Sequence, residues 1–289
     1  MITPFKRDGT IDFDALPAIV DHLIAGGVDY LVVLGTTAET ATLSKEEKIA
    51  LLDRIIDANS GRLPLLLGLG GNHTQELLEM FEWFDLSAFS ALLSVSPYYN
   101  KPNQEGLYQH FKTIATHSSL PVILYNVPSR TGVNIAPETV LRLATDFENI
   151  VAIKEASGDF QQAQTLIKIC PPNFSILSGD DEMSLPMILA GAKGVISVIG
   201  NAMPEEYSKI IHQGLLGNVD QAYSIQYQLL DLIRMIYLEG NPTGIKVLME
   251  ALGICENNLR LPLVRASKEL ALKLNKELKN LLPLQTARS

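Results

Sequence analysis

The chain has 289 residues, of which 47% are hydrophobic and 19% charged, so it can build a full core and is neither disordered nor fibrous. Its formal net charge of −9 comes without a basic cluster, which argues against a nucleic-acid partner, and no apolar run approaches the roughly 20 residues of a membrane span. The two cysteines, Cys170 and Cys255, are far apart and lack CxxC spacing, so we expect no zinc site, no disulfide framework and a reducing cytoplasmic location.

Short runs rich in Val, Ile and Leu alternate with longer amphipathic segments through about two thirds of the chain, which is typical of a parallel sheet whose strands are joined by helices. The apolar runs predict eight strands, at residues 2–5, 30–35, 64–69, 91–96, 121–127, 150–155, 174–178 and 194–199. The i, i+3, i+4 spacing of apolar residues predicts a helix over 13–24. Ser44 and Glu47 predict a capping box at the start of the next helix.

Eight strand and helix units in about 215 residues fit a closed barrel better than an open doubly wound sheet. An open sheet would also call for a dinucleotide-binding fingerprint, and the glycines at 68–71 lack its spacing. We therefore predict an α/β fold, a (β/α)8 TIM barrel, with the catalytic barrel at residues 1–217. Beyond it, helical periodicity continues without strand signals, which predicts a C-terminal helical region at 218–289.

Lys154 is the strongest single candidate for chemistry in this sequence. It interrupts an otherwise apolar strand, IVAIKEA, and catalytic residues of such barrels come from the C-terminal ends of the strands. Burying an unpaired ammonium is costly, and removal from water favours the neutral amine, which is the form that attacks a ketone. A lysine that reaches solvent or pairs with Glu155 is the alternative, and the strand alone does not decide between the two.

Other polar residues gather at neighbouring strand ends. Tyr125 lies one strand before Lys154 and could move protons there, although it could also be a core tyrosine with a satisfied hydroxyl. Thr36 and Thr37 offer hydroxyls and backbone N–H groups that suit a carboxylate, but an ordinary turn and helix cap explains them as well. Arg130 could hold a second carboxylate in a bidentate contact, although most loop arginines are simply solvated.

Five segments carry a resemblance to a known family in both their order and their spacing. They are GTTAET from Gly35, SPYYNKP from Ser96, YNVPSRTG from Tyr125, IKEASG from Ile153 and SGDD from Ser178. Over nearly its whole length the chain resembles the dihydrodipicolinate synthase branch of the class I pyruvate-dependent aldolase and lyase superfamily. It departs from the family pattern in a short first strand before Thr3–Phe5 and in Ala38, where glycine is common.

The resemblance implies a role for each residue of the first half-reaction. Lys154 would form the Schiff base with pyruvate, and Thr37 would hold the pyruvate carboxylate. Tyr125, Thr36 and Tyr99 would form a proton relay, with Tyr99 reaching into a neighbouring subunit.

For the second substrate, the resemblance implies that Arg130 binds the carboxylate of L-aspartate 4-semialdehyde. Gly179 and Ile196 would shape the pocket through their backbone carbonyls. The implied reaction condenses pyruvate with the semialdehyde to 4-hydroxy-tetrahydrodipicolinate in lysine (diaminopimelate) biosynthesis. We expect no cofactor and no metal, because the imine itself is the electron sink, and the family suggests a homotetramer built as a dimer of dimers.

Three alternatives remain open at this point. The nearest is another pyruvate-dependent aldolase, such as N-acetylneuraminate lyase or a 2-keto-3-deoxy sugar acid aldolase. Arg130 and the paired tyrosines Tyr98 and Tyr99 suit a small acidic aldehyde better than a polyhydroxylated chain. A metal-dependent aldolase is disfavoured because no strand-end cluster forms among the histidines, which are His22, His73, His110, His117 and His212. A barrel that only binds a keto acid is disfavoured by the presence of Lys154 and Tyr125.

Overall fold

The computed structural model describes residues 1–286. These residues form two compact units, one of Met1–Leu63 together with the chain from Val198 onward, and one of Pro64–Ser197. None of the described helices is both long enough and apolar enough to cross a membrane.

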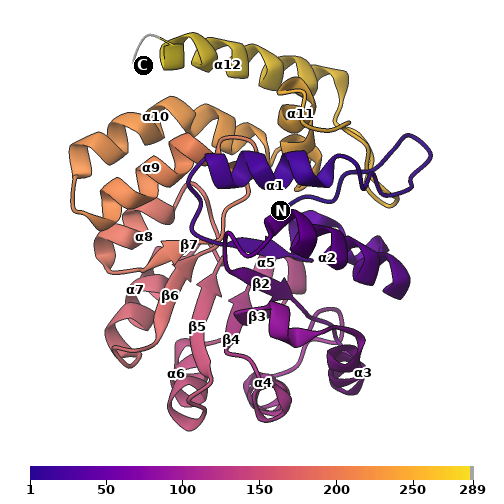
Figure 1. The fold of residues 1–289 in the computed structure, drawn as a ribbon. Helices are drawn as coiled ribbons and strands as arrows, with labels where there is room; N and C mark the ends of the chain where they lie inside the picture. The colour runs from indigo at the N-terminus through magenta and orange to yellow at the C-terminus, as the bar shows by residue number, and fades with distance from the viewer. Residues whose placement is uncertain (287–289) are drawn as a thin grey trace. The chain divides into compact units, whose positions relative to one another are not determined.

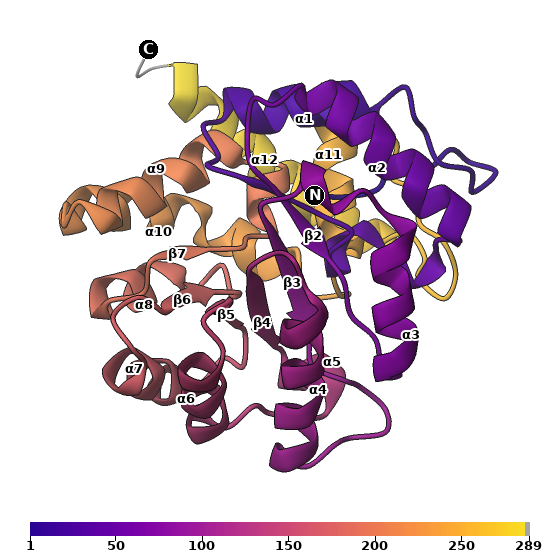
Figure 2. The same ribbon diagram turned by 60° about the horizontal axis from the view of Figure 1, so that its bottom comes forward.

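The unit of Pro64–Ser197 is built on parallel strands that pair in chain order. They are β2 (Leu65–Gly68), β3 (Ala91–Val95), β4 (Val122–Asn126), β5 (Ile150–Glu155), β6 (Ser175–Ser178) and β7 (Gly194–Val195). The connecting helices are α3 (Thr74–Glu79), α4 (Gln104–His117), α5 (Pro128–Thr131), α6 (Pro137–Asp146), α7 (Phe160–Ile169) and α8 (Ser184–Ala190), with short 3-10 turns at Met80–Trp83 and Leu86–Ala88. From α4 to α8 the longer helices follow one another along one face of the sheet (Figure 2).

Burial and capping explain why these residues form these elements. All five residues of β4 are buried, as expected of a parallel strand covered on both faces. Helix α4 begins where the Asn103 side chain accepts a hydrogen bond from the backbone N–H of Gly106. Helix α7 begins in the same way at Asp159, which accepts from the N–H groups of Gln161 and Gln162. The helices that follow β3 and β5 thus each begin at a capping side chain.

The other unit contains one short strand and most of the remaining helices. Its N-terminal elements are α1 (Leu16–Ala25), β1 (Leu31–Val33), 3-10 turns at Thr36–Ala38 and Thr40–Thr42, and α2 (Lys45–Asn59). Its later elements are a 3-10 turn at Ile199–Asn201, α9 (Pro204–Leu215), α10 (Val219–Met235), α11 (Thr243–Ala251) and α12 (Lys268–Thr286). Helices α9 and α10 lie side by side, and α12 packs on α10 and α11 (Figure 1).

Most of the predicted elements are confirmed with shifted ends. Seven predicted strands correspond to β1–β7, and the capping box of Ser44 and Glu47 opens α2. The helical periodicity after Gly217 corresponds to α10–α12, but α12 begins at Lys268 because the Ser267 hydroxyl accepts from the N–H of Leu270. Residues 287–289 of the predicted helical region lie outside the described residues. The boundary at 217 stays a prediction.

The predicted strand at residues 2–5 is wrong. In the described structure Phe5 makes only an isolated bridge to Ile11. Pro4 has no backbone N–H to donate to a neighbouring strand. Isolated hydrogen bonds to other parts of the chain replace the regular pairing of a strand. The N–H of Ile2 donates to Oδ1 of Asn201 at 3.0 Å, and the hydroxyl of Thr3 donates to the carbonyl of Ala38 at 2.8 Å. The segment is therefore buried without being a strand.

Candidate functional site

Lys154 and Tyr125 lie directly opposite each other on neighbouring strands. The parallel register of β4 and β5 pairs the two residues, and Nζ of Lys154 lies 4.3 Å from the centroid of the Tyr125 ring. Lys154 is 7% exposed and Tyr125 is 6% exposed. Among the described residues, no hydrogen bond or ion pair reaches Nζ. A buried amine beside a phenol and away from carboxylates is suited to attack a carbonyl carbon.

Glu155 does not serve as the partner of Lys154. Successive residues of a strand point to opposite faces, so the Glu155 carboxylate faces the helices. There Oε2 accepts hydrogen bonds from Asn126 Nδ2 at 2.9 Å and from Gln162 Nε2 at 3.0 Å, and Oε1 accepts from the N–H of Ser157 at 2.6 Å. The alternative of a Lys154–Glu155 pair is therefore wrong.

The Glu155 carboxylate belongs to a network that also holds the loop after β4. Asn126 donates to Oδ1 of Asn134 at 2.8 Å and accepts from the N–H of Ile135 at 3.0 Å. Asn134 in turn donates to Oε1 of Gln162 at 2.7 Å. The network thus ties both ends of the segment that carries Arg130 to β4, β5 and α7.

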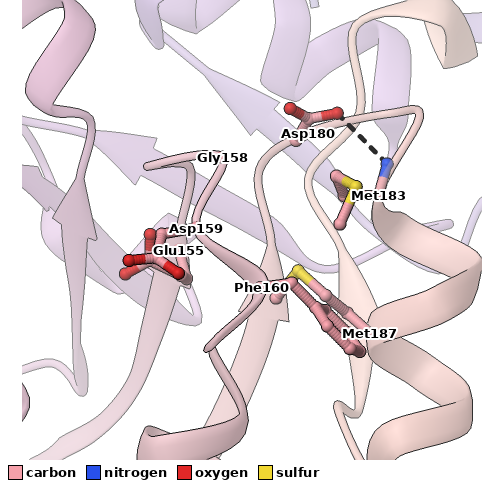
Figure 3. A pocket seen from close by; sticks show the side chains of 7 residues that line it. All are labelled: Glu155, Gly158, Asp159, Phe160, Asp180, Met183 and Met187. Carbon is pink, nitrogen blue, oxygen red and sulfur yellow. Dashed lines mark hydrogen bonds between the residues drawn. The ribbon is translucent and has the colours of Figure 1, made fainter. Parts of the chain in front are cut away.

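A small pocket lies on the same side of β5 as Glu155. Glu155, Gly158 and Asp159 form one side, and Phe160, Met183 and Met187 lie across from them below Asp180 (Figure 3). The carboxylate of Asp180 accepts a hydrogen bond from the N–H of Met183 at 3.2 Å. Because Lys154 points to the opposite face of β5, this pocket is separate from the amine.

Gly179 gives the Lys154 side chain its room. Its N–H donates to the carbonyl of Glu155 at 2.7 Å, which carries the chain past the end of β6 close to β5. A Cβ at this position would lie 2.7 Å from Cε of Lys154 and 2.6 Å from Cβ of Ala156, so only glycine fits. Ile196 follows β7, and its N–H donates to the carbonyl of Ser178 at 2.9 Å. The implied roles of the Gly179 and Ile196 carbonyls stay predictions.

Tyr99 and Arg130 do not contact Lys154 within the described chain. Tyr99 follows β3 with a positive φ of 71° and is 88% exposed. Arg130 lies on the short helix α5, where its side chain is exposed. Both side chains are therefore exposed in the described chain.

Thr36 and Thr37 belong to the other compact unit, on a 3-10 turn directly after β1. The turn is bracketed by two residues in the left-handed region, Leu34 at a φ of 51° and Glu39 at a φ of 54°. Thr40 closes it by donating its hydroxyl to the carbonyls of Leu34 at 2.8 Å and of Gly35 at 3.0 Å. Two backbone positions that disfavour L-residues within six residues mark a turn held in one conformation.

Sequence reasoning missed one residue at this turn. Nδ2 of Asn241, in the C-terminal helical region, donates to Oγ1 of Thr37 at 2.9 Å. In the sequence, Asn241–Pro242 indicates only a break between two helices. No local pattern could have paired it with Thr37.

The chain is similar in sequence to a family of known enzymes. The sequence profile described as the Dihydrodipicolinate synthetase family matches residues 1–281. A protein of Flavobacterium psychrophilum named 4-hydroxy-tetrahydrodipicolinate synthase is 56% identical over 275 residues, covering 95% of this chain and 94% of its own. A protein of the same name from Cytophaga hutchinsonii is 48% identical over 274 residues, covering 95% of this chain and 92% of its own.

Solved structures of the same family are also similar to this chain. Dihydrodipicolinate synthase from Aquifex aeolicus superposes with a TM-score of 0.93 at 41% identity, covering 97% of this chain and 95% of that chain. The chloride-inhibited enzyme from Acinetobacter baumannii, solved in complex with pyruvate, gives a TM-score of 0.93 at 38% identity over 97% of this chain and 96% of that chain. These similarities confirm the predicted α/β fold class, a TIM barrel with C-terminal helices.

Proposed function

Because the chain belongs to the dihydrodipicolinate synthetase family, we propose that it is a lyase that condenses pyruvate with L-aspartate 4-semialdehyde to 4-hydroxy-tetrahydrodipicolinate, in lysine (diaminopimelate) biosynthesis. The observation that carries this proposal is Lys154, a buried amine without a hydrogen-bonding or ionic partner in the described chain, opposite Tyr125 on the next strand. That arrangement suits Schiff-base chemistry on a keto acid.

The chemistry follows from an amine held in this way. Nζ of Lys154 attacks the keto carbon of pyruvate, and loss of water leaves an imine that carries a proton on nitrogen. The imine draws electrons from the methyl group, which loses a proton to give an enamine, and the enamine carbon attacks the aldehyde carbon of the semialdehyde. The amino group of the semialdehyde then attacks the imine carbon, closes the ring and releases Lys154. This sequence uses no cofactor.

The other predicted residues take roles that fit their chemistry. Tyr125, Thr36 and Tyr99 pass protons to and from the carbinolamine and the enamine, and Thr37 holds the pyruvate carboxylate. Arg130, which is exposed on α5, holds the carboxylate of the semialdehyde, and Gly179 and Ile196 line the site with backbone carbonyls.

We place this site in a barrel at residues 1–217, with residues 218–289 as an appended helical region. We further propose that the enzyme assembles in the cytoplasm as a homotetramer, a dimer of dimers. The support for assembly is Tyr99, because a tyrosine that is 88% exposed in one chain suits a residue donated to a neighbouring subunit.

The experiment that tests this function is borohydride reduction in the presence of pyruvate, followed by peptide mass mapping. We expect a covalent adduct on the peptide that contains Lys154 and none in Lys154→Ala. Lys246, another buried lysine, is an internal control because its amine is paired with Glu39, so it should stay unmodified. An adduct on Lys246, or turnover of N-acetylneuraminate in preference to the semialdehyde, would contradict the proposal.

A further inference from the structure

The hydrogen bond between Asn241 and Thr37 joins parts of the chain that are far apart in sequence. Asn241 lies in the turn before α11, is 7% exposed, and donates Nδ2 to Oγ1 of Thr37 at 2.9 Å, across 204 residues of sequence. It reaches the turn of Thr36–Ala38, which carries two residues of the proposed site.

The direction of this hydrogen bond decides what the Thr37 hydroxyl can offer. A threonine hydroxyl has one proton to donate and lone pairs to accept. Because Oγ1 of Thr37 accepts from the Asn241 amide, its own proton is not used in that contact and is free to be donated elsewhere. A carboxylate can only accept hydrogen bonds, so a hydroxyl that still has its proton to donate suits the carboxylate of a 2-oxo acid.

A buried ion pair fixes the two segments at a second point. Lys246, on α11, donates to Oε1 of Glu39 at 2.5 Å and to the carbonyl of Asn258 at 2.7 Å. The second oxygen of Glu39 accepts from the N–H of Arg260 at 3.0 Å. Glu39 ends the turn that carries Thr37, so the C-terminal region holds this turn at its hydroxyl and at its end.

We propose that Asn241 is a positioning residue for pyruvate recognition, which orients the Thr37 hydroxyl as a donor to the pyruvate carboxylate. The inference rests on the proposed function, because it takes pyruvate as the ligand of Thr37. It gives the C-terminal helical region a part in substrate selection, because Asn241 acts on the ligand through the Thr37 side chain.

The test compares two ketones in the borohydride reaction at Lys154. Pyruvate carries the carboxylate, and hydroxyacetone is a neutral ketone of similar size. An aspartate at position 241 would accept the Thr37 proton and place a negative charge beside the ligand. We therefore expect Asn241→Asp to raise the pyruvate concentration for half-maximal trapping by at least about tenfold, while trapping by hydroxyacetone changes less than about twofold. Asn241→Ala should raise the pyruvate value by a smaller factor.

Asn257→Asp is the matched control, because Asn257 is a similarly buried asparagine of the same C-terminal region. Its hydrogen bond to the Glu250 side chain comes from its backbone N–H and not from its side chain. Its two trapping values should keep the wild-type ratio, and thermal unfolding of each variant reports any general loss of structure. If the wild-type protein forms the adduct but Asn241→Asp keeps the wild-type ratio of the half-maximal concentrations for pyruvate and hydroxyacetone, this inference is overturned and the proposed function is not. Absence of the wild-type adduct would overturn the proposed function, and the inference with it.

Discussion

Lys246 and Glu39 form an ion pair of 2.5 Å in which neither side chain is exposed to solvent. Burial lowers the pKa of Lys246, and the Glu39 carboxylate opposes that shift. The centroid of the Phe5 ring lies 4.4 Å from Nζ of Lys246. The charge of Lys246 is thus compensated by a single carboxylate, one carbonyl and an aromatic face.

Removing one partner of this pair should strongly destabilise the protein. We expect Glu39→Gln to lower the free energy of unfolding by about 3–5 kcal/mol at pH 7, because an uncompensated ammonium then stays buried. Urea unfolding followed by circular dichroism measures the change. Lys209→Met, which breaks the exposed pair with Glu205, is the control and should have little effect. An equally small effect of Glu39→Gln would show that the buried pair adds nothing to stability.

Local chemistry decided which features could be predicted from the sequence. The capping box of Ser44 and Glu47 spans three residues, so the sequence alone specifies it. The approach of Lys154 to Tyr125 could be predicted because consecutive strands of a parallel sheet are neighbours. Asn241 could not be assigned, because its contact with Thr37 depends on how chain segments 204 residues apart pack together.

The prediction of a strand at residues 2–5 was wrong for a different reason. An apolar run predicts burial, and Ile2 and Phe5 are indeed buried. Whether a buried run is a strand depends on its hydrogen-bond partners, which here are a side chain of Asn201 and the carbonyl of Ala38. Hydrophobicity predicts where a segment lies better than it predicts how its backbone is paired.

Arg130→Ala should separate the two half-reactions. Pyruvate adduct formation at Lys154 should remain, whereas KM for the semialdehyde should rise by roughly a hundredfold, because only the second carboxylate loses its partner. Steady-state kinetics with each substrate varied, together with borohydride trapping, give both readouts. Arg142→Ala, on α6 of the same unit, is the control and should leave both unchanged. Equal losses in trapping and condensation would mean that Arg130 is structural.

Gln162 should influence the second substrate through the loop that carries Arg130. Gln162→Leu removes hydrogen bonds to Glu155 and Asn134 and leaves a buried carboxylate with one donor fewer. We expect a loss of about 1–3 kcal/mol in the free energy of unfolding and a several-fold rise in KM for the semialdehyde, with trapping by pyruvate preserved. Gln161→Leu, the exposed neighbour on α7, should behave as wild type in both assays. If Gln162→Leu weakened pyruvate trapping and left KM for the semialdehyde unchanged, the link between Gln162 and the Arg130 loop would be wrong.

His110 should make stability depend on pH in a defined window. It is buried, its Nδ1 lies 2.9 Å from the hydroxyl of Thr74, and burial lowers its pKa from 6.5 to about 4. The unfolded chain therefore binds a proton below pH 6.5 that the folded chain takes up only near pH 4. The contribution of His110 is fully present above pH 6.5 and is lost as the pH falls toward 4.

Over that interval His110 should account for up to about 3 kcal/mol of the fall in the free energy of unfolding. Urea unfolding at a series of pH values between 7 and 4 measures it, and His110→Gln should flatten the curve although it is less stable at pH 7. His117 is exposed on the same helix, so His117→Gln is the matched control and should keep the wild-type slope. A His110→Gln curve parallel to wild type would mean that other groups cause the acid sensitivity and that His110 is protonated equally in both states.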